Sequence, residues 1–198
     1  MTDDQLLAAL REGDEVAFTE LVRRYQSSMV RIARLFVKSE PSAEDVVQDT
    51  WIAVIKGAER FEGRSSVKTW LFRILSNRAR DVGTREQRSV PVDLNEEGPT
   101  VDARRFSKGG MWSEPPIPFT DLVDGRLSDA RALRSIRHAL AELPEPQQAV
   151  VTLRDVEGLS TMEVAELLGL SEGNVRVVLH RGRAKIRAAV ETVLGGPS

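Results

Sequence analysis

The chain has 198 residues, of which 41% are hydrophobic and 29% charged, and its formal net charge is −2. It contains no cysteine, which excludes disulfides, thiolate zinc sites and cysteine nucleophiles. Because the N-terminus is acidic and no apolar run is long enough to cross a bilayer, we expect no signal peptide, no membrane span and a cytoplasmic location.

The first helical segment runs from Asp3 to about Lys38, as a short helix followed by a long one. Apolar residues recur along it at the spacing of an amphipathic helix. We expect the core-facing residues to be Phe18, Leu21, Val22, Tyr25, Met29, Ile32, Ala33 and Phe36.

Two further helices are predicted in the N-terminal half. Pro41 ends the first segment, and Ser42 is placed to begin a new helix that lasts until Gly63. Another helix runs from about Ser66 to Gln87. The helix after Ser42 has a core stripe of Val46, Val47, Trp51, Val54, Ile55 and Ala58, and its other face carries Glu44, Asp45, Gln48, Asp49 and Ile52. That face is an acidic patch with one exposed apolar side chain, a pattern that an ordinary solvated surface would also give.

Residues 89–127 differ from what precedes and follows them. They hold five of the nine prolines and show no sustained periodicity, which is typical of a linker. The chain therefore divides into a helical domain at 1–88, a linker at 89–127 and a second helical domain at 128–198.

Helical periodicity returns at Ser128, and Pro144 stops the first helix of the second half. A second helix ends at Gly158, and Ser160 caps a third with Glu163 at the capping-box position. Gly169 ends that helix, and Ser171 caps a fourth that continues to about Val193.

The last two helices have the layout of a helix-turn-helix. The second of them buries a stripe of Val175, Val178, Leu179, Ile186 and Val190, and the opposite face carries Asn174, Arg176, Val177, His180, Arg181 and Arg183. Such a helix can enter the major groove by its N-terminal end, where arginine pairs with guanine and asparagine with adenine. Backbone amides near Ser171 can bind a phosphate.

Basic residues are concentrated in two places. Seven stand against three acidic residues between Glu62 and Arg88, and five against one between Glu172 and Arg187. Two separated basic segments indicate two contacts with a polyanion, although two solvated helix faces would look the same.

Here the motifs resemble a known family. The segment LPEPQQAVVTLRDVEGLSTMEVAELLGLSEGNVRVVLHRGRAKI resembles region 4 of bacterial sigma factors, and the segment from AFTELVRRYQ to LSNRARD resembles region 2. The two matches occur in the family's order, and the short chain is similar to the extracytoplasmic-function (ECF) type. Asn174 and Val177 stand where the family often has small hydroxyl residues, and Gly182 stands where alanine is usual.

The resemblance implies an all-α protein of two small domains that binds core RNA polymerase and directs promoter recognition, DNA opening and transcription initiation. The implied partners are the clamp of the largest polymerase subunit, the flap of the second largest, promoter DNA and, in many family members, an anti-sigma factor. The implied clamp-binding residues are Asp45, Gln48, Asp49 and Ile52. The implied −10 contacts are Phe61, Arg64, Ser65, Lys68, Arg73, Asn77, Arg78 and Arg80, with residues 61–66 as a base pocket. The implied −35 contacts are Ser171, Asn174, Arg176, Val177, His180, Arg181 and Arg183.

Three alternatives compete with this interpretation. An enzyme is disfavoured because the chain has no P-loop, no glycine-rich dinucleotide turn and no metal-ligand pair, and we expect no catalytic residue, cofactor or metal. A repressor that binds duplex DNA alone would use only the C-terminal half. A polymerase-binding decoy would not need Arg176 and Arg181. For Trp70, a core position is favoured over stacking on DNA.

Overall fold

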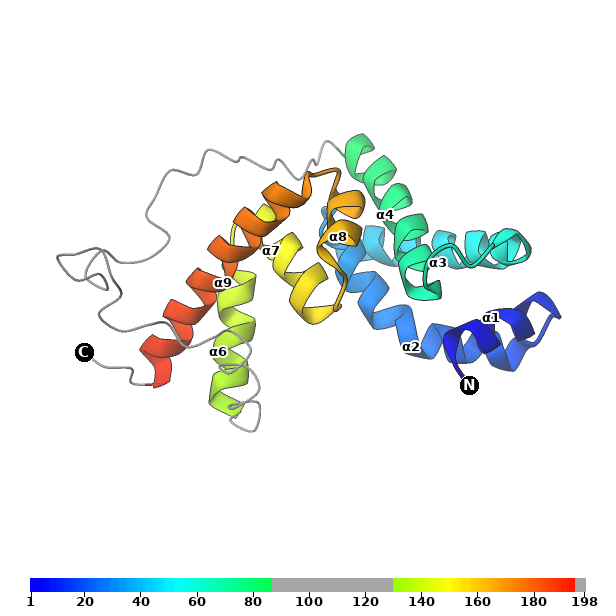
Figure 1. The fold of residues 1–198 in the computed structure, drawn as a ribbon, viewed down its shortest axis with the longest axis horizontal. Coiled ribbons are helices and arrows are strands. Elements are labelled where there is room, and N and C mark those ends of the chain that lie inside the picture. Colours follow the sequence, from blue (N-terminus) through cyan, green and yellow to red (C-terminus); the bar gives the residue numbers. More distant parts are fainter. Residues whose placement is uncertain (87–129, 195–198) are drawn as a thin grey trace.

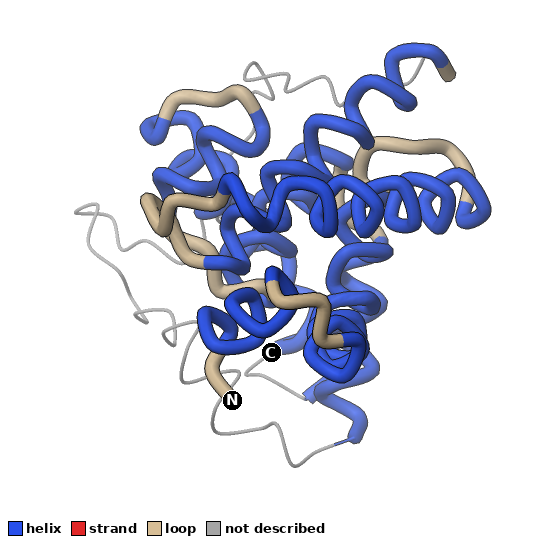
Figure 2. Tube along the Cα trace, turned by 90° about the vertical axis from the view of Figure 1, so that its right-hand side faces the viewer, coloured by secondary structure: helices blue, strands red, loops and turns tan. Residues whose placement is uncertain are grey.

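The computed structural model describes residues 1–86 and 130–194, and every regular element in these two ranges is a helix (Figures 1 and 2). The predicted all-α class is therefore confirmed. The predicted linker at 89–127 lies outside the described residues. None of the helices in the two ranges is long and apolar enough to span a membrane.

The N-terminal half begins with a short helix and a long one, as predicted. α1 (Asp3–Arg11) starts with a capping box between Thr2 and Gln5, and Asp14 caps α2 (Glu15–Ala33). α1 packs on α2 through Leu6 and Leu7, which are both buried. Most of the residues expected to face the core on α2 are buried, while Phe18 and Val22 are partly buried against it.

The start of α3 (Glu40–Gly57) differs from the prediction. Ser39, not Ser42, is the N-cap, and its hydroxyl accepts a hydrogen bond from the backbone of Ser42. Pro41 therefore lies in the first turn of this helix instead of separating two segments, because a proline there lacks only an N–H that would have no helical partner. At its other end α3 stops at Gly57, well before the predicted Gly63.

A short 3₁₀ turn, η1 (Ala58–Arg60), and a loop at 61–66 connect α3 to α4 (Val67–Arg85). α4 starts where the sequence predicted, and Ser66 caps it by accepting from the backbone of Thr69. Gly63 lies in the loop with a φ of 72°, a conformation that favours glycine.

Ile55 was predicted to be a core residue, and this prediction is wrong. Its side chain is 49% exposed. Thr50 is buried instead, and its hydroxyl donates a hydrogen bond to the backbone oxygen of Val46 at 2.7 Å. Ile55 follows Ile52 by three positions, so the two side chains share the outer face of α3. This face therefore has two exposed apolar residues instead of one.

The C-terminal half consists of α6 (Ala130–Ala141), α7 (Glu145–Val151), the π-helical turn η3 (Thr152–Val156), α8 (Thr161–Leu168) and α9 (Glu172–Leu194). The predicted capping box of Ser160 and Glu163 is present at the start of α8, and Gly169 ends it in the left-handed conformation. Ser171 accepts from the backbone of Asn174 at 3.2 Å, and the predicted apolar stripe of α9 is buried. α9 packs on α6, α7 and α8.

Gly182 allows α9 to approach α7 closely. A Cβ atom at this position would lie 2.7 Å from Cγ2 of Val151 and 3.5 Å from Cβ of Gln147. Real carbon atoms do not approach so closely, so a larger residue would require Val151 to move. The close packing of α9 on α7 therefore explains why glycine stands at position 182 in this chain.

The two halves of the chain touch. α8 lies beside α4 in Figure 1, and the two helices are in direct contact. This contact determines which of the predicted site residues are open to a partner.

Candidate nucleic-acid interface

The outer face of α3 exposes all four residues expected to bind polymerase. Asp45, Gln48, Asp49 and Ile52 are exposed there, and Ile52 has 46% of its surface accessible. Ile55 extends the face by one helical turn. The result is a stripe in which carboxylates flank two isoleucines, chemistry that suits a partner with both basic and apolar groups.

The loop at 61–66 is held at its ends and open in its middle. The ring of Phe61 lies 5.0 Å from that of Trp70, and the Trp70 indole also lies against Gly57. Arg64 is exposed and pairs with Glu62 at 3.1 Å, while Ser65 is half-buried. Trp70 thus packs within the protein, which agrees with the favoured expectation, although it is only partly buried.

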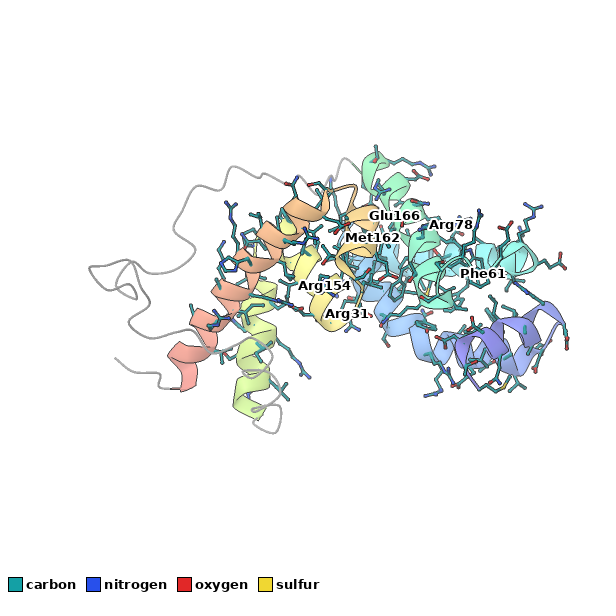
Figure 3. All side chains as sticks on the ribbon, viewed as in Figure 1. Arg31, Phe61, Arg78, Arg154, Met162 and Glu166 are labelled. Atoms are coloured by element: carbon teal, nitrogen blue, oxygen red, sulfur yellow. The ribbon has the colours of Figure 1, made fainter. Side chains whose placement is uncertain are left out.

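Three of the α4 cations expected to contact DNA are engaged by the C-terminal half. Arg73 pairs with Glu166 of α8 at 2.5 Å, and Arg80 donates to the backbone oxygen of Leu167 at 2.6 Å. Figure 3 shows Glu166 where α8 borders α4. Lys68 donates to the backbone oxygen of Glu157. These partners occupy donor groups that a DNA phosphate would otherwise use.

Acidic side chains of the C-terminal half strengthen the same contact. The Glu157 carboxylate, in a residue only 4% exposed, accepts from Nε of Arg31 at 2.9 Å. Glu163 accepts from the hydroxyl of Thr69. Burial works to raise the pKa of Glu163, but hydrogen bonds from Thr69 and Ser160 and the charge of Lys68 together lower it below its usual range.

The remaining two candidates on α4 contact their own half of the chain. Arg78 lies 4.0 Å from Asp49 on the outer face of α3. Asn77 accepts a long hydrogen bond of 3.5 Å from Arg80. Both contacts are at the surface, so they leave these side chains available.

The N-terminal half of α9 presents an open face. Arg176, Val177 and His180 are exposed, and Val177 has 47% of its surface accessible. The guanidinium of Arg176 pairs at 2.8 Å with Glu172 of the same helix. Along this face a shallow groove is lined by Arg176, Leu179, His180, Arg183, Ala184 and Arg187.

Other residues of the predicted −35 set are less open. Asn174 and Arg181 are half-buried, while Ser171 is exposed but serves as the cap of α9. Arg183 holds both carboxylate oxygens of Asp155, at 2.9 and 2.5 Å. This hydrogen-bonded pairing raises the pKa of Arg183 and directs its guanidinium toward η3.

Comparison with known proteins identifies the family. The family model described as sigma-70 region 2 matches residues 21–89, and the model of sigma-70 region 4 matches residues 133–186. The ECF RNA polymerase sigma-E factor of Haemophilus influenzae is 30% identical over 194 residues, which are 98% of each chain. The chain belongs to the ECF family of RNA polymerase sigma factors. Members of this family are initiation factors, not enzymes, that bind core RNA polymerase and promoter DNA.

Further relatives support this assignment. The ECF RNA polymerase sigma-E factor of Escherichia coli K12 is 29% identical, covering 98% of this sigma factor and 97% of its own length. A solved structure of CnrH in complex with the cytosolic domain of CnrY is 26% identical, with a TM-score of 0.54 over 99% of both chains. RpoE of Bartonella quintana, solved with the anti-sigma factor NepR, shares the fold at 21% identity and a TM-score of 0.53, covering 91% of this sigma factor and 98% of RpoE.

The family models also divide the sigma factor into parts. Region 2 includes α3, the loop at 61–66 and α4, and region 4 includes α7, α8 and the first part of α9. α1 lies before the region 2 match. Any role of α1 must therefore be inferred from its own contacts.

Proposed function

We propose that this sigma factor reads the −35 element with α9 and opens and reads the −10 element with the loop at 61–66 and α4. We further propose that the outer face of α3 binds the clamp of the largest polymerase subunit, and that region 4 binds the flap of the second largest. The observation that carries the proposal is the open face of α9, which follows a helix-turn-helix turn and has a fully buried opposite side.

The −35 assignment rests on the chemistry of that open face. Arg176 and His180 offer hydrogen-bond donors, and Val177 offers an apolar contact suited to a thymine methyl. All three belong to the first half of the helix, the part that enters the major groove in helix-turn-helix proteins. The capped N-terminus of α9 next to Ser171 favours a nearby phosphate.

The −10 assignment requires the two halves to separate. Lys68, Arg73 and Arg80 can contact a DNA backbone only after region 4 releases them, since their donors engage oxygens of region 4. A melted base needs a pocket and cations on the neighbouring backbone to offset the cost of unstacking. We therefore assign the described arrangement to a closed form that cannot bind the −10 strand.

A protein partner that favours the closed form would inhibit this sigma factor. One relative of the same fold was solved with an anti-sigma factor, and we propose that an anti-sigma factor acts here. We also propose that the chain works in the cytoplasm, where RNA polymerase acts, and that it has no catalytic activity of its own.

The proposal is tested by transcription in vitro with core polymerase on a library of genomic fragments. Promoter-specific transcripts are expected only when this sigma factor is present. The clamp-binding face is tested with Ile52→Ser and Ile55→Ser together, which should weaken polymerase binding roughly tenfold if two apolar side chains are buried there. Val16→Ser removes an exposed apolar residue from α2 and should leave binding unchanged. Absence of specific transcripts on every template would refute the proposal.

A further inference from the structure

Arg11, the last residue of α1, reaches across to the start of the loop at 61–66. Its Nε donates to the backbone oxygen of Ala58 at 2.8 Å, and its Nη2 donates to the backbone oxygen of Phe61 at 2.5 Å. Ala58 begins η1, and Phe61 is the first residue of the loop. One guanidinium therefore joins the helical end of α3 to the loop that we assign to base recognition.

The docking of α1 does not depend on these two hydrogen bonds. α1 is attached to region 2 by the buried side chains of Leu6 and Leu7. Its first turn is held through Asp3, which accepts from the hydroxyl of Tyr25 and pairs with Arg24 at 3.0 Å. Because Arg11 is itself exposed, its contacts add little to the core. The main consequence of the two hydrogen bonds is that they fix the positions of the carbonyl groups of Ala58 and Phe61.

The loop has few other restraints. At its start Phe61 packs on Trp70, and at its end Ser66 caps α4. Between these ends the chain passes through exposed residues at 62–64, including Gly63 with positive φ. A pocket that receives a single base must hold its backbone in one conformation before the base arrives, since ordering it on binding costs affinity. Arg11 orders the end of the loop nearest to α3.

We propose that Arg11 is a positioning residue for base selection at the −10 element. It acts through the backbone of Ala58 and Phe61 and does not touch the DNA. Its guanidinium suits this role because its planar, forked donors can bind two carbonyl oxygens at once, which a lysine ammonium at the end of one flexible stem does poorly. This inference rests on the proposed function of the loop.

The test uses the holoenzyme and a promoter selected from the genomic library, with either the −10 or the −35 element randomised. Sequencing the transcripts gives the base preference at each position. Arg11→Ala should lower the preference at the −10 position read by the loop roughly threefold to tenfold, the effect of losing charged hydrogen bonds, and leave the −35 preference unchanged. Arg11→Lys should fall between Arg11→Ala and the unchanged protein.

Two controls separate the possible results. Arg23→Ala removes the same charge from an exposed arginine that, within residues 1–86 and 130–194, pairs with Glu20 of its own helix, and should leave both preferences unchanged. Combined Arg64→Ala and Ser65→Ala alters the loop itself and should lower the −10 preference. If the loop variant has no effect, the proposed function of the loop fails. If the loop variant acts but Arg11→Ala does not, or Arg11→Ala lowers transcription without changing the −10 preference, the role of Arg11 is overturned.

Discussion

The two helices that we assign to promoter DNA differ in what covers them. On α4, the cations Lys68, Arg73 and Arg80 are bound to oxygens of region 4. On α9, the exposed Arg176 pairs with Glu172 of the same helix. The proposed −10 surface on α4 is therefore occupied within the protein, and the proposed −35 surface on α9 is open.

This difference assigns different tasks to the two regions. Under the proposed assignments, region 4 reaches duplex DNA through α9 while the halves stay together, but region 2 exchanges an intramolecular partner for a DNA strand. The exchange uses similar chemistry, since carboxylate and carbonyl oxygens of region 4 take the place of phosphate oxygens. If α4 binds the −10 strand as proposed, the domain contact makes that binding conditional.

The largest effect is expected from Arg176→Ala on the open helix. If Arg176 pairs with a base, promoter binding by the holoenzyme should weaken by about 1–3 kcal/mol and the preference at one −35 position should relax. The matched variant is Arg183→Ala, since Arg183 is directed toward Asp155 and its loss should lower thermal stability instead. Binding to single-position promoter variants measures the first effect and thermal denaturation the second. A greater change of base preference in Arg183→Ala than in Arg176→Ala would contradict this assignment.

The next largest effect is on stability, through the packing of α9 on α7. Gly182→Ala places a Cβ atom against Val151, and the net loss of stability should be about 1–2 kcal/mol once the gain in helix propensity is included. Thermal or denaturant unfolding measures it. In a chain that carries Val151→Ala, Gly182→Ala should cost less, because the removed methyl groups leave room for the new one. Gly173→Ala on the same helix meets only Ser171 Oγ at 3.8 Å and should be neutral or stabilising.

Local sequence signals predicted most of the helices because caps and periodicity act over a few residues. Ser66, Ser160 and Gly169 begin or end helices as expected. The start of α3 was misplaced because proline was interpreted as a breaker, although it is also favoured in a first turn. Ile55 was assigned to the core because the apolar positions of α3 are too numerous to define one stripe from sequence alone.

The candidate sites were less predictable, since contacts between distant parts of the chain determine which residues are free. Sequence reasoning identified the cations of α4 but not the residues that cover them. Glu163 was recognised only as a capping residue, yet its carboxylate also accepts from Thr69, 94 positions away. The pairing of Arg183 with Asp155 depends on the π-helical turn at η3, for which no sequence signal was identified. The contacts of Arg11 leave no sequence signal, because it donates to backbone carbonyl groups, which every residue has.

The smallest effect is expected from two substitutions in α8 that weaken its contact with α4. Glu163→Gln combined with Glu166→Gln removes two charges from the domain contact and keeps the side-chain shapes. Glutamine can also serve at the third position of a capping box, so α8 should remain folded. The Arg73–Glu166 pair is partly exposed, and the two changes together should weaken the closed form by about 1 kcal/mol.

Such a shift in the equilibrium should raise the affinity of the free sigma factor for a single-stranded −10 oligonucleotide roughly fivefold, because binding requires the open form. Fluorescence anisotropy measures this affinity. Glu40→Gln with Glu142→Gln removes two charges from exposed positions elsewhere and corrects for the change in net charge. Affinity for a −35 duplex should change equally in both double variants, because the face of α9 is open in either form. If the two double variants bind the −10 strand equally well, region 4 does not restrict access to α4.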